Sequence, residues 1–95
     1  IEPVCQASLI RFSKDRLLFS NPADTKRMKL TVKLSRDEGK TWPVERMVHS
    51  GPSAYSSLAR LKSGRIGLLY ERGTTSPYEQ ISFATFDLAW LQGAN

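Results

Sequence analysis

The feature that most constrains the fold of this chain is one run of eight residues, from Ser35 to Trp42, which reads SRDEGKTW. Ser35 and Asp37 have short polar side chains that can bond neighbouring backbone amides, and Gly39 can adopt a positive φ. The ring of Trp42 is large and apolar enough to cover such a turn. The run therefore predicts a rigid, self-satisfied turn between two strands. Its acidic side chains are expected to serve folding rather than catalysis.

The rest of the chain consists of short apolar segments, rich in β-branched and aromatic residues, that turn residues interrupt every few positions. This pattern is typical of an all-β meander. Leu30, Val32 and Leu34 alternate with polar residues, which predicts a half-buried strand. We expect loops over 21–24, 50–53 and 72–79, because these segments hold proline, glycine, asparagine or aspartate. The expected strands are 5–12, 17–20, 28–34, 44–49, 55–61, 66–71 and 80–86, followed by a short helical turn over 87–91.

Composition excludes several classes of function. The chain has 95 residues, which allows one domain at most, and a formal charge of +5. Its basic residues are scattered without a long run or interleaved aromatics, so we do not expect nucleic-acid binding. The single cysteine, Cys5, excludes an internal disulfide and is expected to be a buried, inert thiol. His49 is the only histidine, so no paired-histidine metal site can form. We expect no metal, no cofactor and no membrane-spanning segment.

Strand direction assigns the polar residues to two rims, which are the two opposite edges formed by the ends of the strands. In an antiparallel meander, an odd strand begins at the rim where an even strand ends. Arg27 directly precedes the third expected strand, Tyr55 begins the fifth and Glu71 closes the sixth. These three residues should therefore share one rim, while the 35–42 turn and Lys14 fall on the opposite rim. Taken alone, each of these side chains would be interpreted as a solvent-exposed charge or as a packing residue. Because all three are expected on one rim, they form a candidate site.

Several blocks of the sequence resemble a known family. The run over 35–42 matches the Asp box, a turn between the third and fourth strands of a blade in sialidases and related β-propellers. Two blocks precede this run, LFSNP over 18–22 and Arg27 with LTV over 30–32, and two follow it, GPSAYSSL over 51–58 and GLLYE over 67–71. In this order the blocks resemble the C-terminal part of exo-α-sialidases. The resemblance implies a six-bladed propeller that hydrolyses terminal sialic acids from glycoconjugates with retention of configuration. It divides the chain into one full blade over residues 1–50 and an incomplete last blade over 51–95.

The resemblance also implies roles for the three rim residues. Arg27 matches the third arginine of a triad that grips the substrate carboxylate, Tyr55 the nucleophile, and Glu71 the acid that orients the first triad arginine. Sialic acid carries its carboxylate on the anomeric carbon, so a neutral phenol avoids the like charge that a carboxylate nucleophile would meet. The family's general acid and base, an aspartate and a glutamate, and its other two arginines find no matching positions. The chain alone is therefore expected to be inactive or nearly so.

The partners implied are sialylated glycoproteins, glycolipids and oligosaccharides, together with the remainder of the propeller. A secreted, periplasmic or lysosomal location agrees with the family. Three other interpretations stay open: a non-catalytic carbohydrate-binding or scaffolding propeller, a trans-sialidase, and a small basic β domain that folds alone. Linkage preference and oligomeric state are not encoded in any motif of the chain.

Overall fold

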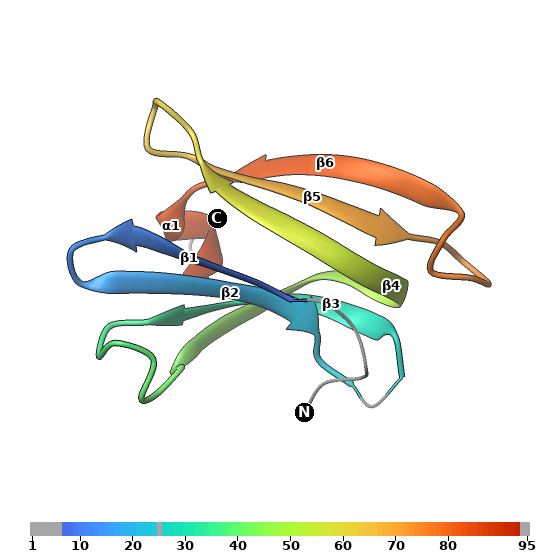
Figure 1. Cartoon of the computed structure of the whole chain (residues 1–95), viewed down its shortest axis with the longest axis horizontal. Helices are drawn as coiled ribbons and strands as arrows, with labels where there is room; N and C mark the ends of the chain where they lie inside the picture. The colour runs from blue at the N-terminus through green and yellow to red at the C-terminus, as the bar shows by residue number, and fades with distance from the viewer. Residues whose placement is uncertain (1–6, 25, 94–95) are drawn as a thin grey trace.

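The computed structural model describes residues 7–24 and 26–93, and they form one antiparallel sheet of six strands in sequence order. The sheet is strongly curled, so that its two halves face each other (Figure 1). The prediction of an all-β meander is thus confirmed. The elements are β1 (Ser8–Ser13), β2 (Arg16–Pro22), β3 (Met28–Ser35), β4 (Val44–Arg60), β5 (Ile66–Arg72), β6 (Gln80–Phe86) and the helical turn α1 (Leu88–Leu91).

Strand β4 is continuous where the sequence predicted two strands joined by a loop. The first part of β4 pairs with β3 and the second part with β5, so the loop predicted over 50–53 is wrong. The crossing stays extended because its backbone groups find partners in both neighbours. The Ser53 amide donates to the Arg27 carbonyl at 2.8 Å, and the Gly73 amide donates to the Pro52 carbonyl at 3.0 Å. The division into blades over 1–50 and 51–95 falls at this crossing and stays a prediction.

Strand β2 is longer than predicted at its C-terminal end. Asn21 and Pro22 were expected in a loop, but they continue the strand, and Pro22 pairs with Leu30 of β3. The described pairing of β1 with β2 begins opposite Ser20, so Pro22 lies beyond it at a strand end. A residue without an N–H is tolerated at that position.

One apolar core lies between the two halves of the sheet. The predicted burial of Leu30, Val32 and Leu34 is confirmed, because each is 0% exposed, but Thr31 between them is also buried, at 5% exposure. Each fully buried aliphatic side chain of this kind stabilises the fold by roughly 1.5–3 kcal/mol. Since every strand and α1 contribute, the two halves are stabilised together. The core residues are Phe12, Leu18, Leu30, Val32, Leu34, Leu58, Ile66, Leu68, Phe86 and Leu91. Cys5, expected to be buried, lies outside the described residues.

The 35–42 turn satisfies its own polar groups, as predicted. The Ser35 hydroxyl accepts from the amides of Asp37 at 3.3 Å and Gly39 at 2.9 Å. The Asp37 carboxylate accepts from the Thr41 amide at 2.8 Å and from the Thr41 hydroxyl. Gly39 has a φ of +85°, which favours glycine. These hydrogen bonds, led by those from Thr41, lower the pKa of Asp37 to about 2.

Two contacts tie this turn to the preceding strands. The Trp42 ring lies 5.8 Å from the ring of Phe19 in β2, measured between centroids. Arg11 of β1 donates two hydrogen bonds to the Glu38 carboxylate, at 3.0 and 2.6 Å. The turn is thereby fixed against β1 and β2, and its acidic residues are occupied by structural bonds.

The predicted helical turn is confirmed as α1. The Asp87 carboxylate caps it by accepting from the Trp90 amide at 2.8 Å, as expected of an N-cap aspartate. In the described part of the chain, no helix is long and apolar enough to cross a membrane.

The first prediction concerns the role of Asp37 in the turn. Its pKa falls from 3.8 to about 2 on folding, so its contribution to stability is complete above about pH 4 and is lost as the pH falls through about 2. Asp37→Asn should therefore speed amide hydrogen exchange over residues 35–42 at neutral pH, measured by mass spectrometry. Asp15→Asn, in the exposed turn between β1 and β2, is the matched control. Equal exchange in the two variants would contradict the structural role.

Candidate functional site

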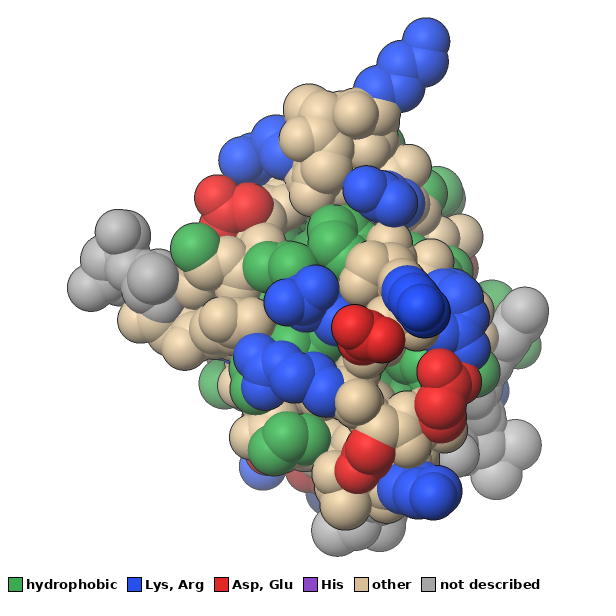
Figure 2. All heavy atoms as spheres, turned by 90° about the vertical axis from the view of Figure 1, so that its left-hand side faces the viewer, with side chains coloured by type: hydrophobic (Ala, Val, Ile, Leu, Met, Phe, Trp, Pro, Cys, Tyr) green, Lys and Arg blue, Asp and Glu red, His purple; other side chains and the backbone are tan. Residues whose placement is uncertain are grey.

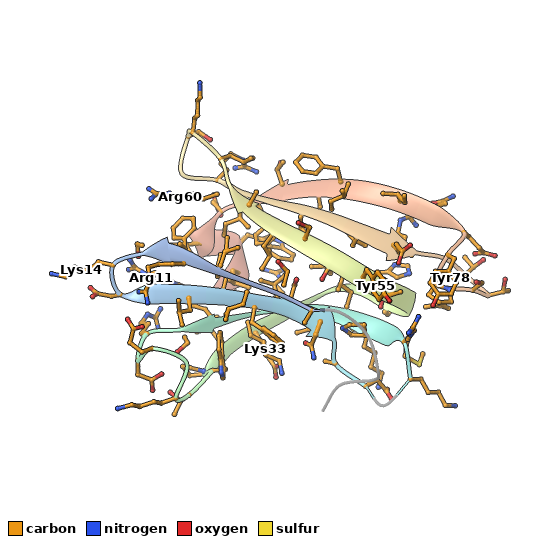
Figure 3. The ribbon with its side chains drawn as sticks, viewed as in Figure 1. Arg11, Lys14, Lys33, Tyr55, Arg60 and Tyr78 are labelled. Carbon is orange, nitrogen blue, oxygen red and sulfur yellow. The ribbon has the colours of Figure 1, made fainter. Side chains whose placement is uncertain are left out.

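The structure brings the three predicted rim residues together at the crossing of β4. The guanidinium carbon of Arg27 lies 5.7 Å from the centroid of the Tyr55 ring. The Glu71 carboxylate accepts a hydrogen bond from the Tyr55 amide at 3.2 Å. Tyr55 was predicted to begin a strand, but it lies inside β4, close to where β4 starts to pair with β5. Figure 3 shows Tyr55 at the end of the molecule away from Arg11 and Lys14, which confirms the predicted separation of the rims.

Backbone irregularities lie beside these residues. The register between β3 and β4 shifts between Met28 and Leu30, where Lys29 has a φ of 62°. A second shift, between β4 and β5, lies at Ser53 to Ser56 and includes Tyr55. Bulges of this kind bend a strand and redirect its side chains, and they are common beside functional sites. Here the shifts lie next to Arg27 and at Tyr55, whose side chains meet although the two residues come from different elements.

Tyr55 is held by its backbone and presents its ring to solvent. Ala54 beside it is fully buried, whereas Tyr55 is 47% exposed. The amide of Tyr55 donates to the Glu71 carboxylate, and the phenol takes no part in that bond. The phenol is therefore accessible to a ligand while its attachment point is fixed.

A cavity of about 350 Å³ opens beside Tyr55 and Glu71. Its volume falls in the range of about 300–1,000 Å³ that is usual for small-molecule sites. Hydroxyl groups and apolar side chains share its wall. The lining residues are Ala7, Ser8, Tyr55, Ser56, Ser57, Leu69, Tyr70, Glu71 and Ile81. A second hollow of about 450 Å³ lies beside α1, and none of the three predicted residues lines it.

Tyr78 is a member of this group that sequence reasoning missed. It comes from the 73–79 loop, and its hydroxyl accepts a hydrogen bond from Nη1 of Arg27. The guanidinium carbon lies 5.8 Å from the centroid of the Tyr78 ring, so the guanidinium sits near two tyrosine rings. Figure 3 shows Tyr55 and Tyr78 at the same end of the molecule. The signal was present, because the loop after β5 starts at the rim where Glu71 closes that strand.

The opposite rim has a different character. Lysine and arginine side chains there are interspersed with acidic ones (Figure 2). Two of the pairs are in contact, Arg11 with Glu38 at 2.6 Å and Arg65 with Asp87 at 3.9 Å. Exposed pairs of this kind contribute little to stability.

The grouping of Arg27, Tyr55 and Tyr78 has a definite chemical capacity. A guanidinium presents a planar fork of donors that suits a carboxylate, and a phenol can act as a nucleophile when a base takes its proton. Within residues 7–24 and 26–93, no three acidic or histidine side chains converge to hold a metal ion. The group can therefore be described as a candidate site for an organic anion.

Comparison with known proteins gives one consistent result. No family model matches the chain. A sialidase of Micromonospora viridifaciens is 42% identical over 102 aligned residues, covering 97% of this chain and 15% of that protein. Among solved structures, a Hadza microbial sialidase superposes with a TM-score of 0.77 at 36% identity, over 95% of this chain and 19% of its own. A leech intramolecular trans-sialidase, complexed with 2,7-anhydro-Neu5Ac, superposes with a TM-score of 0.79 at 26% identity, over 94% of this chain and 17% of its own.

These likenesses cover nearly all of the chain but only a small part of each relative. The chain spans 15% of the length of the curated bacterial relative. Its curled antiparallel sheet is that of a sialidase-type propeller, of which it forms about two blades. The expected fold is thereby confirmed, while the roles of Arg27, Tyr55 and Glu71 stay predictions.

The second prediction concerns Glu71 as the anchor of Tyr55. Glu71→Ala removes the acceptor of the Tyr55 amide, so exchange at that amide should rise by roughly two- to tenfold, as for the loss of one ordinary hydrogen bond. The measurement is hydrogen exchange of peptides covering residues 53–58. Glu45→Ala is the matched control, because Glu45 is an exposed glutamate elsewhere on β4. No difference between the two variants would show that Glu71 does not anchor Tyr55.

Proposed function

Because the chain belongs to the sialidase family, we propose that it forms part of an exo-α-sialidase. Such an enzyme is a retaining glycoside hydrolase that removes terminal sialic acids from glycoproteins, glycolipids and oligosaccharides. The observation that carries the proposal is the meeting of Arg27, Tyr55 and Glu71 on one rim, beside a cavity of about 350 Å³. These are the positions that match the triad arginine, the nucleophile and the orienting acid of the family.

Arg27 is proposed to bind the carboxylate of the sialic acid. Its backbone is fixed by the bond from the Ser53 amide at 2.8 Å, and its guanidinium extends toward the rings of Tyr55 and Tyr78. A planar guanidinium can donate two parallel hydrogen bonds to a carboxylate, which fixes orientation as well as position. The anomeric carbon, which bears that carboxylate, would then lie close to the Tyr55 phenol.

Tyr55 is proposed to attack the anomeric carbon. A base takes the phenol proton, the phenol oxygen bonds to the anomeric carbon, and the glycosidic bond breaks as an acid gives its proton to the leaving alcohol. Water then attacks the same carbon, the bond to Tyr55 breaks, and the phenol regains a proton. Two displacements at one carbon retain its configuration. The resemblance assigns the base to a glutamate and the acid to an aspartate that have no matching positions in these 95 residues.

Glu71 is proposed to act as a positioning residue. Its carboxylate holds the Tyr55 amide, and by resemblance it also orients the first arginine of the triad. A single carboxylate with two oxygens can accept from both donors at once. Removing the Glu71 side chain would therefore weaken both the positioning of Tyr55 and the binding of the substrate carboxylate by the arginine triad.

The third prediction separates Tyr55 from Arg27 in the protein that carries this segment. Tyr55→Phe should lower kcat on a fluorogenic sialoside by on the order of 10³-fold or more, because the nucleophile is gone. The same variant should still bind free N-acetylneuraminic acid, measured by isothermal titration calorimetry. Arg27→Gln should instead weaken that binding by about tenfold or more, since a charge-assisted bond to the carboxylate is lost. Near-normal turnover by Tyr55→Phe would refute the assignment of the nucleophile.

The fourth prediction concerns the chain by itself. Without the acid, the base and two of the arginines, most of the transition-state stabilisation is absent. The isolated 95 residues should show no turnover of the same sialoside above that of buffer. Substantial turnover would overturn the proposed division of the catalytic residues.

Transfer within the substrate is the second candidate function. The structural likeness to the leech intramolecular trans-sialidase favours it, and the residues proposed here serve either reaction. The released sugar distinguishes the two, because hydrolysis yields the free sialic acid and intramolecular transfer yields its 2,7-anhydro form. Mass spectrometry of the products identifies which reaction occurs. A third outcome, carbohydrate binding with no turnover, would identify a non-catalytic propeller.

A further inference from the structure

The loop over 73–79, between β5 and β6, is closed by one carboxylate. Glu79 accepts hydrogen bonds from the amides of Thr74 at 2.6 Å and Thr75 at 3.4 Å. It also accepts from the hydroxyls of Thr75 at 2.7 Å and Thr74 at 3.3 Å. These bonds, led by that from the Thr75 hydroxyl, lower the pKa of Glu79 to about 2. The group is therefore an anion at any pH near neutrality and keeps the loop closed.

Gly73 makes this closure sterically possible. A Cβ on Gly73 would stand 1.9 Å from the Ser76 carbonyl oxygen and 2.4 Å from a carboxylate oxygen of Glu79. Both distances are far shorter than any non-bonded contact allows, so only glycine admits this loop. The base of the loop is joined to the crossing of β4, because the Gly73 amide donates to the Pro52 carbonyl at 3.0 Å. His49 adds a contact of 3.1 Å between its Nε2 and the Gly73 carbonyl.

Tyr78 directly precedes the closing carboxylate in the chain. Its amide donates to the Ser76 hydroxyl at 3.3 Å within the loop, and its own hydroxyl accepts from Arg27. Tyr78 thus belongs to the loop that Glu79 closes, and its phenol is in contact with the Arg27 guanidinium.

We propose that the 73–79 loop is a preformed support for Arg27, in which Glu79 holds the loop closed and Tyr78 orients the guanidinium toward a carboxylate ligand. The nature of that ligand rests on the proposed function, whereas the support itself rests on the contacts described. Tyr78 and Glu79 are positioning residues, because they act on the ligand through Arg27. A long arginine side chain that is already oriented loses less conformational freedom when it binds. The support should therefore improve binding of the carboxylate more than it changes the chemical step.

The test uses three variants of the protein that carries this segment. Tyr78→Phe keeps the ring and removes the oxygen acceptor, Tyr78→Leu removes both, and Glu79→Gln removes the negative charge that closes the loop. Each should raise KM for a fluorogenic sialoside by about three- to tenfold, as expected for the loss of one oriented hydrogen bond or of the order behind it. The kcat should stay within about twofold, and Tyr78→Leu should have a larger effect than Tyr78→Phe. Glu45→Gln, an exposed glutamate on β4, is the control for charge removal.

Two structural readouts do not depend on activity. Glu79→Gln should speed hydrogen exchange of peptides covering residues 72–80, because Thr74 and Thr75 bond a weaker acceptor. Crystal structures of Glu79→Gln and Tyr78→Phe should show the Arg27 guanidinium in a changed direction. An unchanged Arg27 in both crystal structures would overturn the proposal, as would an active parent enzyme whose KM is unaltered in all three variants. An inactive parent enzyme would instead refute the proposed function, and the direction of Arg27 would then decide the role of the loop.

Discussion

The site and the fold both depend on the crossing of β4 from one half of the sheet to the other. At this crossing the Ser53 amide holds the backbone of Arg27, and the Pro52 carbonyl holds the base of the 73–79 loop. Just after the crossing, the amide of Tyr55 donates to the Glu71 carboxylate. The first part of β4 forms its hydrogen bonds with β3, and the second part forms them with β5. The candidate site therefore lies where the sheet changes its hydrogen-bonding partner.

Local physics made most of the fold predictable. Alternation in β3 and the self-satisfied bonds of Ser35 and Asp37 were readable because they involve neighbours in sequence. The crossing of β4 was not readable, because Gly51 and Pro52 favour a loop when only their neighbours in sequence are considered. The bonds that keep this segment extended join Ser53 to Arg27 and Pro52 to Gly73, and each spans more than twenty residues of the chain. A long-range hydrogen bond overrides a local preference without leaving a local sign.

The site was predictable to the extent that it follows from strand direction. Arg27, Tyr55 and Glu71 could be assigned to one rim because strand polarity alternates in a meander. Their contacts could not be derived, since the strands that carry them contain register shifts whose positions no local pattern marks. Tyr78 was missed for a different reason. From the sequence its loop looks like a simple connection. The hydrogen bonds of Glu79 that shape the loop join residues four or five positions apart, and no hydrophobic periodicity marks them.

The anchoring of Tyr55 through its amide has a consequence for substitutions at this position. Every amino acid except proline offers the same N–H, so the bond to Glu71 makes no demand on the side chain at position 55. The exposed ring is likewise outside the apolar core. A substitution of the phenol would therefore leave both the bond to Glu71 and the apolar core unchanged. In this architecture the choice of side chain at position 55 is separate from the stability of the sheet.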